Sequence, residues 1–445
     1  MRVIDRNAIS LGLTSLQMME SAGKSLAAMA AEGSPGLVLV VCGKGNNGGD
    51  GMAAARYLQH TADTHVCYLD ERGMSPECAA QLALLRTCKV GLHPFRCAED
   101  LRNASHLFDN AGLIIDAVLG TGSGGPLREP LLTCVQLANR SGAPILSADV
   151  PTPGINAARI CAFHRPKVPG SEIVDIGIPL GAETTVGPGE LTLVPARDPD
   201  AHKGEGGKVL VIGGGPYQGA PYLAGIGALR AGADIVRIAS PVFEPIPDLI
   251  YERLSGSRIT EEHLERLIPL AREADVVVCG NGLGSESHHV VLAIAPHCRK
   301  AVFDADALRQ PLPRAGETIY TPHAGEFVRM TGNSLPDDPV GRGRSVKSAA
   351  ISGTILLKGR IDVISDGARV RFNKTGTPGM AVGGTGDVLA GVVSGLFCRI
   401  PAFEAACIAA YVNGRAGAAA ESVSGGGILA SEVADMIPGQ LYGGK

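Results

Sequence analysis

The segment LVLVVCGKGNNGGDGMAAARYLQH, residues 37–60, decides the fold class of the first part of the chain. It starts with a continuous apolar run at 37–42, which is typical of a strand buried on both faces of a sheet. A turn rich in glycine and asparagine follows, and a helix-compatible stretch begins at Gly51. A strand, a glycine-rich turn and a helix in this order predict the first βα unit of a parallel sheet.

The same alternation continues after this segment. Further candidates for buried strands are THVCYL (64–69), LIIDAVL (113–119) and APILSADV (143–150), and helix-compatible segments lie between them at 79–88 and 129–140. This rhythm predicts an α/β fold with a Rossmann-like, doubly wound parallel sheet.

The alternation stops at PARDPDAHKGEGG (195–207), which is polar and lacks periodicity. A second series of strands and helices then begins with KVLVIGGG at 208–215. We therefore predict two domains, 1–198 and 199–445. The two halves share no repeated motif, which indicates two different α/β domains in tandem.

Composition excludes several classes of partner. The 445 residues carry a formal net charge of -4 and no run of basic residues, so we expect neither nucleic acid nor an anionic membrane as the main partner. No apolar run is long enough to span a bilayer, and MRVIDRNAIS at the start is not a signal peptide. The 11 cysteines include no CxxC pair, which predicts reduced thiols in a cytoplasmic protein.

The first glycine-rich turn carries the polar side chains of Lys44, Asn46, Asn47 and Asp50. Glycines permit close approach of a ligand to the backbone, and the start of the next helix offers free N–H groups to a phosphate. A turn built only for helix–sheet packing would not need these polar residues. The pattern favours a binding site over a packing turn.

Two more candidate ligand residues lie at strand ends. Asp116 ends LIIDAVL and precedes the segment Gly120–Pro126, and Asp149 ends APILSADV. Open α/β sheets bind ligands at the carboxyl ends of their strands, and the oxygen atoms could also hold a hard cation. The alternative for each aspartate is a cap on the next helix.

In the second half, GGTGD (383–387) opens a helix whose apolar positions recur along one face. The backbone N–H groups of Thr385, Gly386 and Asp387 would form an anion hole for a phosphoryl group, and Asp387 could take a proton from an attacking hydroxyl. Lys358 and Gly359 add phosphate-binding chemistry upstream. The alternative is that Asp387 only caps the helix.

His323 lies between a strand end and a helix that carries Glu326, in TPHAGEF. An isolated histidine is usually structural, but this position makes contact with a ligand at least equally reasonable. The segment DADAL (304–308) reaches another strand end.

These motifs carry a resemblance to two known families. GNNGGDG (45–51), DAVLGTG (116–122) and the Asp-x-Pro turn at Asp149 resemble the NAD(P)H-hydrate epimerases. The dehydratase-like motifs are HKGEGGKVLVIGGG, GAPYLAG, GNGLG, DADAL, TPHAGEF, LKG and GMAVGGTGDVLAG, and they resemble the NAD(P)H-hydrate dehydratases, which have a ribokinase-like fold. Together they resemble the fused bifunctional enzymes that repair hydrated NADH and NADPH.

By this resemblance, the first domain interconverts the R and S hydrates, and Asp149 is the candidate for moving protons at the epimerised carbon. The resemblance implies a potassium ion held by Asn47, Asp116 and Thr152. The residues expected to contact the hydrated dinucleotide are Asn46, Asn47, Gly48, Gly49, Asp50, Gly120, Thr121, Gly122, Ser123, Gly124, Gly125, Pro126 and Asp149.

The second domain would phosphorylate the hydroxyl of the S hydrate with ADP and Mg²⁺, and loss of phosphate would regenerate the nicotinamide ring and leave AMP. Asp387 would be the catalytic base. The residues expected to contact the hydrate are Ala220, Leu283, His323 and Asp387. Those expected at the nucleotide are Lys358, Gly359, Arg360, Ile361, Asp362 and Gly386.

The chain departs from the usual motifs at several positions. Asn281 replaces proline in GPGLG, Asp362 replaces threonine in KGxxT, and Thr152-Pro153 replaces Ser-Gly in the Asp-x-Pro turn. Two alternatives stay open: a ribokinase-like small-molecule kinase, and a first domain that binds a dinucleotide without epimerising it. We expect small-molecule partners and a homo-oligomer.

Overall fold

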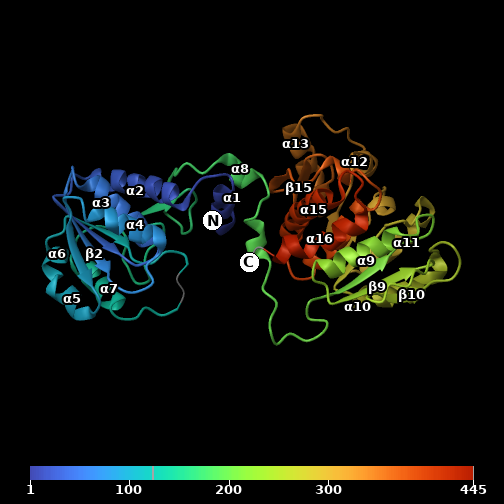
Figure 1. The fold of residues 1–445 in the computed structure, drawn as a ribbon, viewed down its shortest axis with the longest axis horizontal. Helices are drawn as coiled ribbons and strands as arrows, with labels where there is room; N and C mark the ends of the chain where they lie inside the picture. The colour runs from blue at the N-terminus through green and yellow to red at the C-terminus, as the bar shows by residue number, and fades with distance from the viewer. Residues whose placement is uncertain (123–124, 444–445) are drawn as a thin grey trace. The chain divides into compact units, whose positions relative to one another are not determined.

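The apolar segments form two sheets in a computed structural model that describes residues 1–122 and 125–443 (Figure 1). Ser123 and Gly124, both predicted to contact the dinucleotide, lie outside the described residues. The observed mixture of helices and largely parallel sheets confirms the predicted α/β class.

The first sheet has the strand order β3-β2-β1-β4-β5-β6-β7 in the described part of the chain, and all its neighbouring strands are parallel. The chain order reverses between β1 and β4, which is the point where doubly wound sheets bind ligands. The strands are β1 (Leu37–Cys42), β2 (Asp63–Leu69), β3 (Gly91–Phe95), β4 (Leu113–Ala117), β5 (Ile145–Ala148), β6 (Arg159–Phe163) and β7 (Glu172–Val174).

Side chains alternate between the two faces of this sheet, so each strand contributes to two cores. Helices α2, α3 and α4 cover one face of the sheet, and α5, α6 and α7 cover the other (Figure 1). Val38 and Val40 of β1 pack beneath the first group, and Leu39 and Val41 pack beneath the second. These helices are α2 (Ser15–Ala31), α3 (Asn46–Leu58), α4 (Pro76–Leu85), α5 (Ala98–Asn103), α6 (Ser105–Asp109) and α7 (Leu131–Arg140).

The second sheet has the order β10-β9-β8-β11-β12-β13-β14-β15-β16, again counted over the described residues. Its chain order reverses between β8 and β11, and only β15 runs antiparallel to its neighbours. The strands are β8 (Lys208–Ile212), β9 (Ile235–Ser240), β10 (Ile250–Arg253), β11 (Val276–Cys279), β12 (Lys300–Phe303), β13 (Glu317–Tyr320), β14 (Thr354–Leu357), β15 (Asp362–Ser365) and β16 (Val370–Asn373).

Helices cover both faces of the second sheet. Val209 and Val211 of β8 pack with α9, α14, α15 and α16, and Leu210 and Ile212 pack with α10 to α13. The helices are α9 (Ala220–Arg230), α10 (Leu264–Glu273), α11 (His288–Ile294), α12 (Ala324–Thr331), α13 (Pro339–Ala349), α14 (Thr385–Phe397), α15 (Ala402–Ser424) and α16 (Ala430–Tyr442).

Several short helices complete the described structure. They are α1 (Arg2–Ser10), α8 (Leu180–Thr184) and the 3₁₀ helices η1 (Glu190–Leu193), η2 (Glu261–His263), η3 (Ser285–Ser287), η4 (Ala295–His297), η5 (Ala305–Ala307) and η6 (Pro378–Met380).

The described chain divides into two units: the first comprises Met1 and Ala8–Pro179, and the second comprises Arg2–Asn7 and Leu180–Lys445. The division lies before the predicted boundary at residue 198, because the segment after Pro179 packs with the second unit. For example, the backbone N–H of Val186 donates to the carbonyl oxygen of Phe372 at 2.9 Å.

The start of α1 also belongs to the second unit. Asn7 is 2% exposed, and its Nδ2 donates to the carbonyl oxygen of Ala182 at 3.3 Å and to Oε2 of Glu190 at 3.0 Å. The N–H of Gly189 donates to Oδ1 of Asn7 at 2.7 Å. The two units are therefore not two consecutive halves of the sequence.

Close packing of α9 against α14 fixes the helix that carries Asp387. A Cβ atom on Gly391 would lie 2.0 Å from the carbonyl oxygen of Ala224, so any larger residue would push these helices apart. The N-terminal turn of α14 is thereby held in a defined position at the edge of the second sheet.

Some local predictions need correction. Helix α3 begins at Asn46, not at Gly51, because Gly48 allows a tight start: a Cβ there would lie 2.0 Å from the carbonyl oxygen of Gly43.

All 11 cysteines are free thiols, and most are buried. Of the helices in the described part of the chain, none combines the length and apolar character that crossing a membrane requires.

Candidate functional sites

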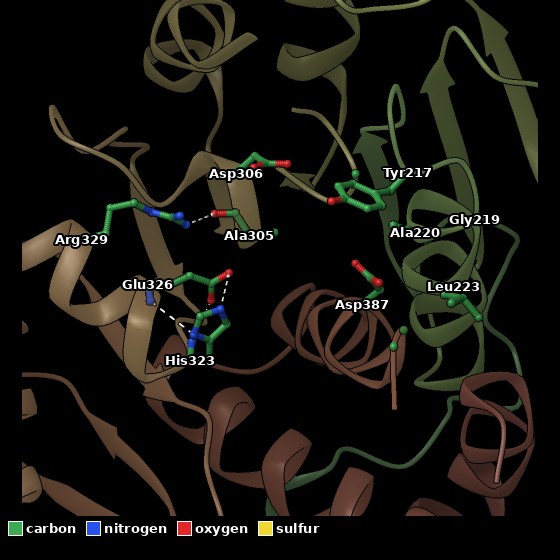
Figure 2. Close-up of a pocket in the computed structure, with 13 residues that line it drawn as sticks. Tyr217, Gly219, Ala220, Leu223, Ala305, Asp306, His323, Glu326, Arg329 and Asp387 are labelled. Carbon is green, nitrogen blue, oxygen red and sulfur yellow. Dashed lines mark hydrogen bonds and ion pairs between the residues drawn. The ribbon is translucent and has the colours of Figure 1, made fainter. Parts of the chain in front are cut away.

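A cavity of about 440 Å³ lies at the carboxyl ends of β8, β11, β12 and β13 in the second unit. His323, Glu326 and Arg329 reach it from α12, and Asp387 faces it from the start of α14 (Figure 2). The lining residues are Tyr217, Gly219, Ala220, Leu223, Gly282, Ala305, Asp306, His323, Glu326, Arg329, Gly383, Gly384 and Asp387. Of the residues predicted to contact the hydrate, Ala220, His323 and Asp387 are in this set.

Asp387 lies in the first turn of α14, which starts after Gly384 in the left-handed conformation at φ 95°. Nδ2 of Asn281 donates to its Oδ1 at 2.7 Å. Burial raises the pKa of Asp387, as does the carboxylate of Asp304, and the pKa reaches about 7 although the hydrogen bond from Asn281 lowers it. A carboxyl group that titrates near neutral pH is suited to act as a general base.

The backbone at the start of α14 offers an anion hole. The first hydrogen bond within the helix runs from the N–H of Val388 to the carbonyl oxygen of Gly384 at 3.0 Å. The N–H groups of Thr385, Gly386 and Asp387 precede it and have no carbonyl partner within the helix. Together with the positive end of the helix dipole, they favour a negatively charged phosphoryl group.

Lys358 lies beside this anion hole, since a Cβ atom on Gly386 would be 3.4 Å from its Nζ. Nζ also lies 2.7 Å from Oδ1 of Asp304 and 3.8 Å from Oε2 of Glu326. Burial alone would lower the pKa of Lys358, but the two carboxylates outweigh it and the pKa lies above its ordinary value. Lys358 is thus a partly buried cation next to the proposed phosphoryl position.

His323 both caps a helix and lines the cavity. Its Nδ1 accepts hydrogen bonds from the N–H groups of Gly325 at 3.0 Å and Glu326 at 3.3 Å. An Nδ1 that accepts leaves the proton of a neutral ring on Nε2. Nε2 lies 3.4 Å from Oε1 of Glu326 (Figure 2), and the side chain is 60% exposed. The two roles considered for His323 are therefore compatible.

Other predicted residues lie away from the cavity. The side chain of Leu283 is 1% exposed and belongs to the core, and its neighbour Gly282 lines the cavity instead. Gly359 and Arg360 are exposed on the turn between β14 and β15, next to Ile361. This turn is not part of the cavity lining, so a nucleotide there would extend beyond the cavity.

Asp362, which replaces the usual threonine, holds this turn in place. Its Oδ1 accepts from the N–H of Gly359 at 2.9 Å, and its Oδ2 accepts from Nδ2 of Asn373 at 2.9 Å. Burial raises the pKa of Asp362 to about 6, against the lowering effect of both hydrogen bonds. Its carboxylate is engaged within the chain.

In the first unit, the predicted residues gather where the chain order reverses between β1 and β4. Asn46 to Asp50 form the first turns of α3, directly after β1. Nδ2 and Oδ1 of Asn47 are buried and have no hydrogen-bond partner within the described residues. A Cβ atom on Gly120, which follows β4, would lie 3.3 Å from Cβ of Asn47. The two glycine-rich segments therefore meet at this edge of the sheet.

Asp116 and Thr152 lie together at the same edge. The hydroxyl of Thr152 donates to Oδ1 of Asp116 at 2.7 Å, and its N–H donates to Oδ2 at 2.8 Å. The hydroxyl also accepts from the N–H of Leu119 at 3.1 Å. Burial raises the pKa of Asp116, although these hydrogen bonds and that of Ser147 lower it. Pro153 does not turn the hydroxyl of Thr152 away from Asp116.

Asp149 follows β5 and has a left-handed backbone at φ 67°, which is unusual for a residue other than glycine. Nζ of Lys167 contacts both of its carboxylate oxygens. Burial raises the pKa of nearby Asp50 well above its ordinary value, and the charge of Asp149 adds to this effect while Lys167 opposes it.

The remaining predicted residues of this site are solvent-exposed. They are Thr121, Gly122, Gly125 and Pro126.

Sequence reasoning missed two residues that contact the predicted catalytic aspartates. Lys167 follows β6 at the same sheet edge as Asp149, so its position after a strand could have indicated it. Asn281 follows β11 and was noted only as a departure from a motif. Arg329 and Tyr217 also line the cavity without having been predicted.

Comparisons with known proteins agree with this arrangement. Residues 15–162 match the family model of the YjeF-related protein N-terminus, and residues 209–439 match the model of NAD(P)H-hydrate dehydratase. The chain is 55% identical over 442 residues to the bifunctional NAD(P)H-hydrate repair enzyme Nnr of Methanospirillum hungatei, covering 99% of this chain and 92% of that protein. The protein of the same name from Methanothermobacter thermautotrophicus is 39% identical, with 98% and 93% covered.

Solved structures resemble the second unit. The ADP/ATP-dependent NAD(P)H-hydrate dehydratase of Bacillus subtilis, crystallised with ATP and Mg²⁺, is 29% identical with a TM-score of 0.50, covering 57% of this chain and 95% of that one. A ribokinase-like superfamily protein from Enterococcus faecalis is 22% identical with a TM-score of 0.50, covering 57% and 93%. These matches confirm the ribokinase-like fold, and together the comparisons support the bifunctional repair enzyme over a ribokinase-like small-molecule kinase.

Proposed function

The chain belongs to the family of bifunctional NAD(P)H-hydrate repair enzymes, and from this premise we propose that its two units hold two separate active sites. The epimerase site would lie at the carboxyl ends of β1 and β4 in the first unit, and the dehydratase site would lie in the cavity of the second unit. The proposal assigns epimerase activity to residues 1–198 and dehydratase activity to 199–445, although α8 and η1 pack with the second unit. The observation that supports it best concerns Asp387. Its carboxyl group has a pKa of about 7 and faces the cavity beside the anion hole.

In the dehydratase site, Asp387 accepts the proton of the hydroxyl group on the S hydrate as this oxygen attacks the terminal phosphorus of ADP. The N–H groups of Thr385, Gly386 and Asp387 stabilise the transferring phosphoryl group, and AMP leaves. The phosphorylated carbon then loses phosphate, the electron pair of the neighbouring ring nitrogen replaces the broken C–O bond, and loss of a ring proton restores NADH or NADPH.

We propose ADP as the phosphoryl donor, with Mg²⁺ carried by its phosphate oxygens. The related Bacillus subtilis enzyme was crystallised with ATP and Mg²⁺. Lys358 supports the proposal, because a partly buried cation beside Gly386 is placed to neutralise phosphate charge. The turn Gly359–Asp362 would contact the rest of the nucleotide.

In the epimerase site, we propose that Asp149 moves protons at the carbon that carries the hydroxyl group. Lys167 keeps its carboxylate oriented, and Asn46 to Asp50 with the segment after β4 hold the dinucleotide. Epimerisation lets the dehydratase, which accepts the S hydrate, also use the R hydrate.

The residues present fit a potassium ion at this site. Oδ1 of Asn47 is a buried oxygen without a partner in the described structure, and Asp116 and Thr152 add a carboxylate and a hydroxyl oxygen at the same edge. Oxygen ligands suit a hard monovalent cation. When bound, potassium would supply a fixed positive charge near an anionic dinucleotide.

We also propose a cytoplasmic location and a homo-oligomer with small-molecule partners only. The free thiols of all 11 cysteines support a reducing compartment. The net charge of -4 gives no support for a nucleic-acid partner.

The test of the proposed function uses the purified full chain and a mixture of R and S hydrates of NADH. With ADP and Mg²⁺, absorbance of NADH should return for both hydrates. A mixture that yields only half of the NADH at enzymatic rate would show dehydration without epimerisation. Accumulation of a phosphorylated hydrate without release of phosphate would instead support a kinase.

A further inference from the structure

A single carboxamide, that of Asn281, joins the buried carboxylate of Asp304 to the carboxylate of Asp387. Asn281 follows β11, where the chain order of the second sheet reverses, and its side chain is 0% exposed. Its Nδ2 donates to Oδ2 of Asp304 at 3.0 Å and to Oδ1 of Asp387 at 2.7 Å. Both N–H bonds of the amide are therefore used on carboxylates.

The amide can adopt only one orientation in this place. If Oδ1 faced the carboxylates, three acceptor oxygens would meet without a hydrogen between them. In the observed orientation, Oδ1 is buried and has no partner among the described residues. An unpaired buried carbonyl group costs free energy, so the contribution of Asn281 to stability does not by itself account for its presence.

In the GPGLG motif, which the segment GNGLG resembles, proline stands at the position of Asn281. Proline has no side-chain donor and could not join Asp304 to Asp387. The substitution in GNGLG thus adds a contact to the proposed catalytic base.

We infer that Asn281 is a positioning residue for phosphoryl transfer, which holds Oδ1 of Asp387 so that Oδ2 faces the cavity and accepts the substrate proton. Oδ2 has no hydrogen-bond partner in the described part of the structure, and Asp387 lines the cavity. The inference rests on the proposed role of Asp387 as base.

The charges around Asp387 explain why one donor matters. The carboxylates of Asp304 and Glu326 raise its pKa, as burial does, and the ammonium group of Lys358 lowers it together with Asn281. The other charged or titratable groups of the cavity are Asp306, His323, Arg329 and Tyr217. Without the amide, Asp387 and Asp304 would face each other with no donor between them, and the protonated form of Asp387 would be favoured.

The test compares how kcat for dehydration of the S hydrate depends on pH in the wild type, Asn281→Ala and Asn281→Pro. Loss of the donor should move the acid limb of the profile upward by about one pH unit, so that kcat at pH 6 falls about tenfold and recovers at high pH. KM for ADP should stay unchanged. Asn281→Ser keeps one donor and should give an intermediate shift.

Ser394→Ala is the matched control. It removes a buried side-chain hydrogen bond from α14, the helix that carries Asp387, without contact to Asp387 itself. Its profile should equal that of the wild type. Binding of ADP by calorimetry checks that each variant is folded, and the serine variant carries the test if the other two do not fold. An unshifted acid limb in the folded variants overturns the inference. A wild type that does not recover NADH with ADP would instead overturn the proposed function.

Discussion

The ammonium group of Lys167 contacts both carboxylate oxygens of Asp149, across a sequence separation of 18 residues. The side chain of Lys167 is 16% exposed and that of Asp149 is 10% exposed, so water screens this pair little. The pair joins the loops after β5 and β6, at the same sheet edge as Asn47 and Asp116. It therefore gives the proposed proton-moving carboxylate a fixed direction at the epimerase site.

Replacing Lys167 by methionine should lower the rate of R-to-S conversion by about 10²-fold, because Asp149 would lose its orientation and its counter-charge. Dehydration of the pure S hydrate should not change, since its site lies in the other unit. Chiral chromatography of the hydrates measures the rate. Lys24→Met, on the exposed side of α2, is the control and should behave as wild type. Normal epimerisation by the Lys167 variant would show that the ion pair is only structural.

Exchange of potassium for tetramethylammonium should slow epimerisation, because the oxygen atoms of Asn47, Asp116 and Thr152 would lose their cation. Asp116→Ala should lower the rate by about 10–100-fold and abolish its dependence on potassium. The measurement is the initial rate of R-to-S conversion at constant ionic strength. Equal rates in both cations would contradict a potassium site, and a rate equal to the spontaneous one in both would indicate a binding module.

Asp387→Asn should reduce ADP-dependent recovery of NADH by about 10²–10⁴-fold, because an amide keeps the size of the side chain but cannot accept the substrate proton. Epimerisation by the same variant is the internal control and should be unchanged. If the variant recovers NADH at nearly the normal rate, Asp387 only caps the helix and is not the catalytic base.

The pH dependence of dehydration should follow the ionisation of Asp387. Its pKa of about 7 lies above that of an ordinary aspartate, and the base must be ionised to accept a proton. The rate should therefore be high above pH 7 and should fall about tenfold for each unit of pH well below it. Initial rates from pH 5 to 9 at saturating ADP test this expectation, and a rate that stays constant down to pH 5 would contradict it.

Lys358→Met should destabilise the second unit by about 3 kcal/mol, because Asp304 would remain buried without its cation. Adding Asp304→Asn should restore most of this stability, since the unpaired charge is then removed. Denaturant unfolding measures both variants. If Lys358 also binds phosphate, the stable double variant should still bind ADP weakly. Normal ADP binding by the double variant would limit Lys358 to a structural role.

Local patterns were sufficient to predict the α/β class and the strand that begins each series, but not every strand of the two sheets. The apolar run at 37–42 became the central strand β1, and KVLVI became β8, because a strand covered by helices on both faces needs apolar residues at every position. Asp116, Asp149 and Asp387 were predicted as candidate site residues from their positions, since Asp116 lies near the end of β4, Asp149 follows β5 and Asp387 lies in the first turn of α14.

The contacts of these aspartates could not be predicted in this way. Lys167 and Asn281 reach Asp149 and Asp387 across loops whose conformation depends on the folded sheet, and no spacing rule connects them. The side chain of Leu283 enters the core while the backbone of Gly282 lines the cavity, which a motif alone does not distinguish. The first residue of α3 was also misplaced, because a glycine-rich segment can be a loop or a helix start.

The hydrogen bonds of Asn7 to Gly189 and Glu190 have a consequence for the order of events during synthesis. Residues 2–7 emerge from the ribosome before the first unit, yet their partners emerge only after the whole first unit has been made. The sheet of the first unit can fold in the meantime. Until residues 182–190 are made, the side-chain amide of Asn7 at the beginning of α1 stays exposed to solvent. A fragment that begins at residue 180 would therefore lack residues 2–7 and could not form the complete second unit.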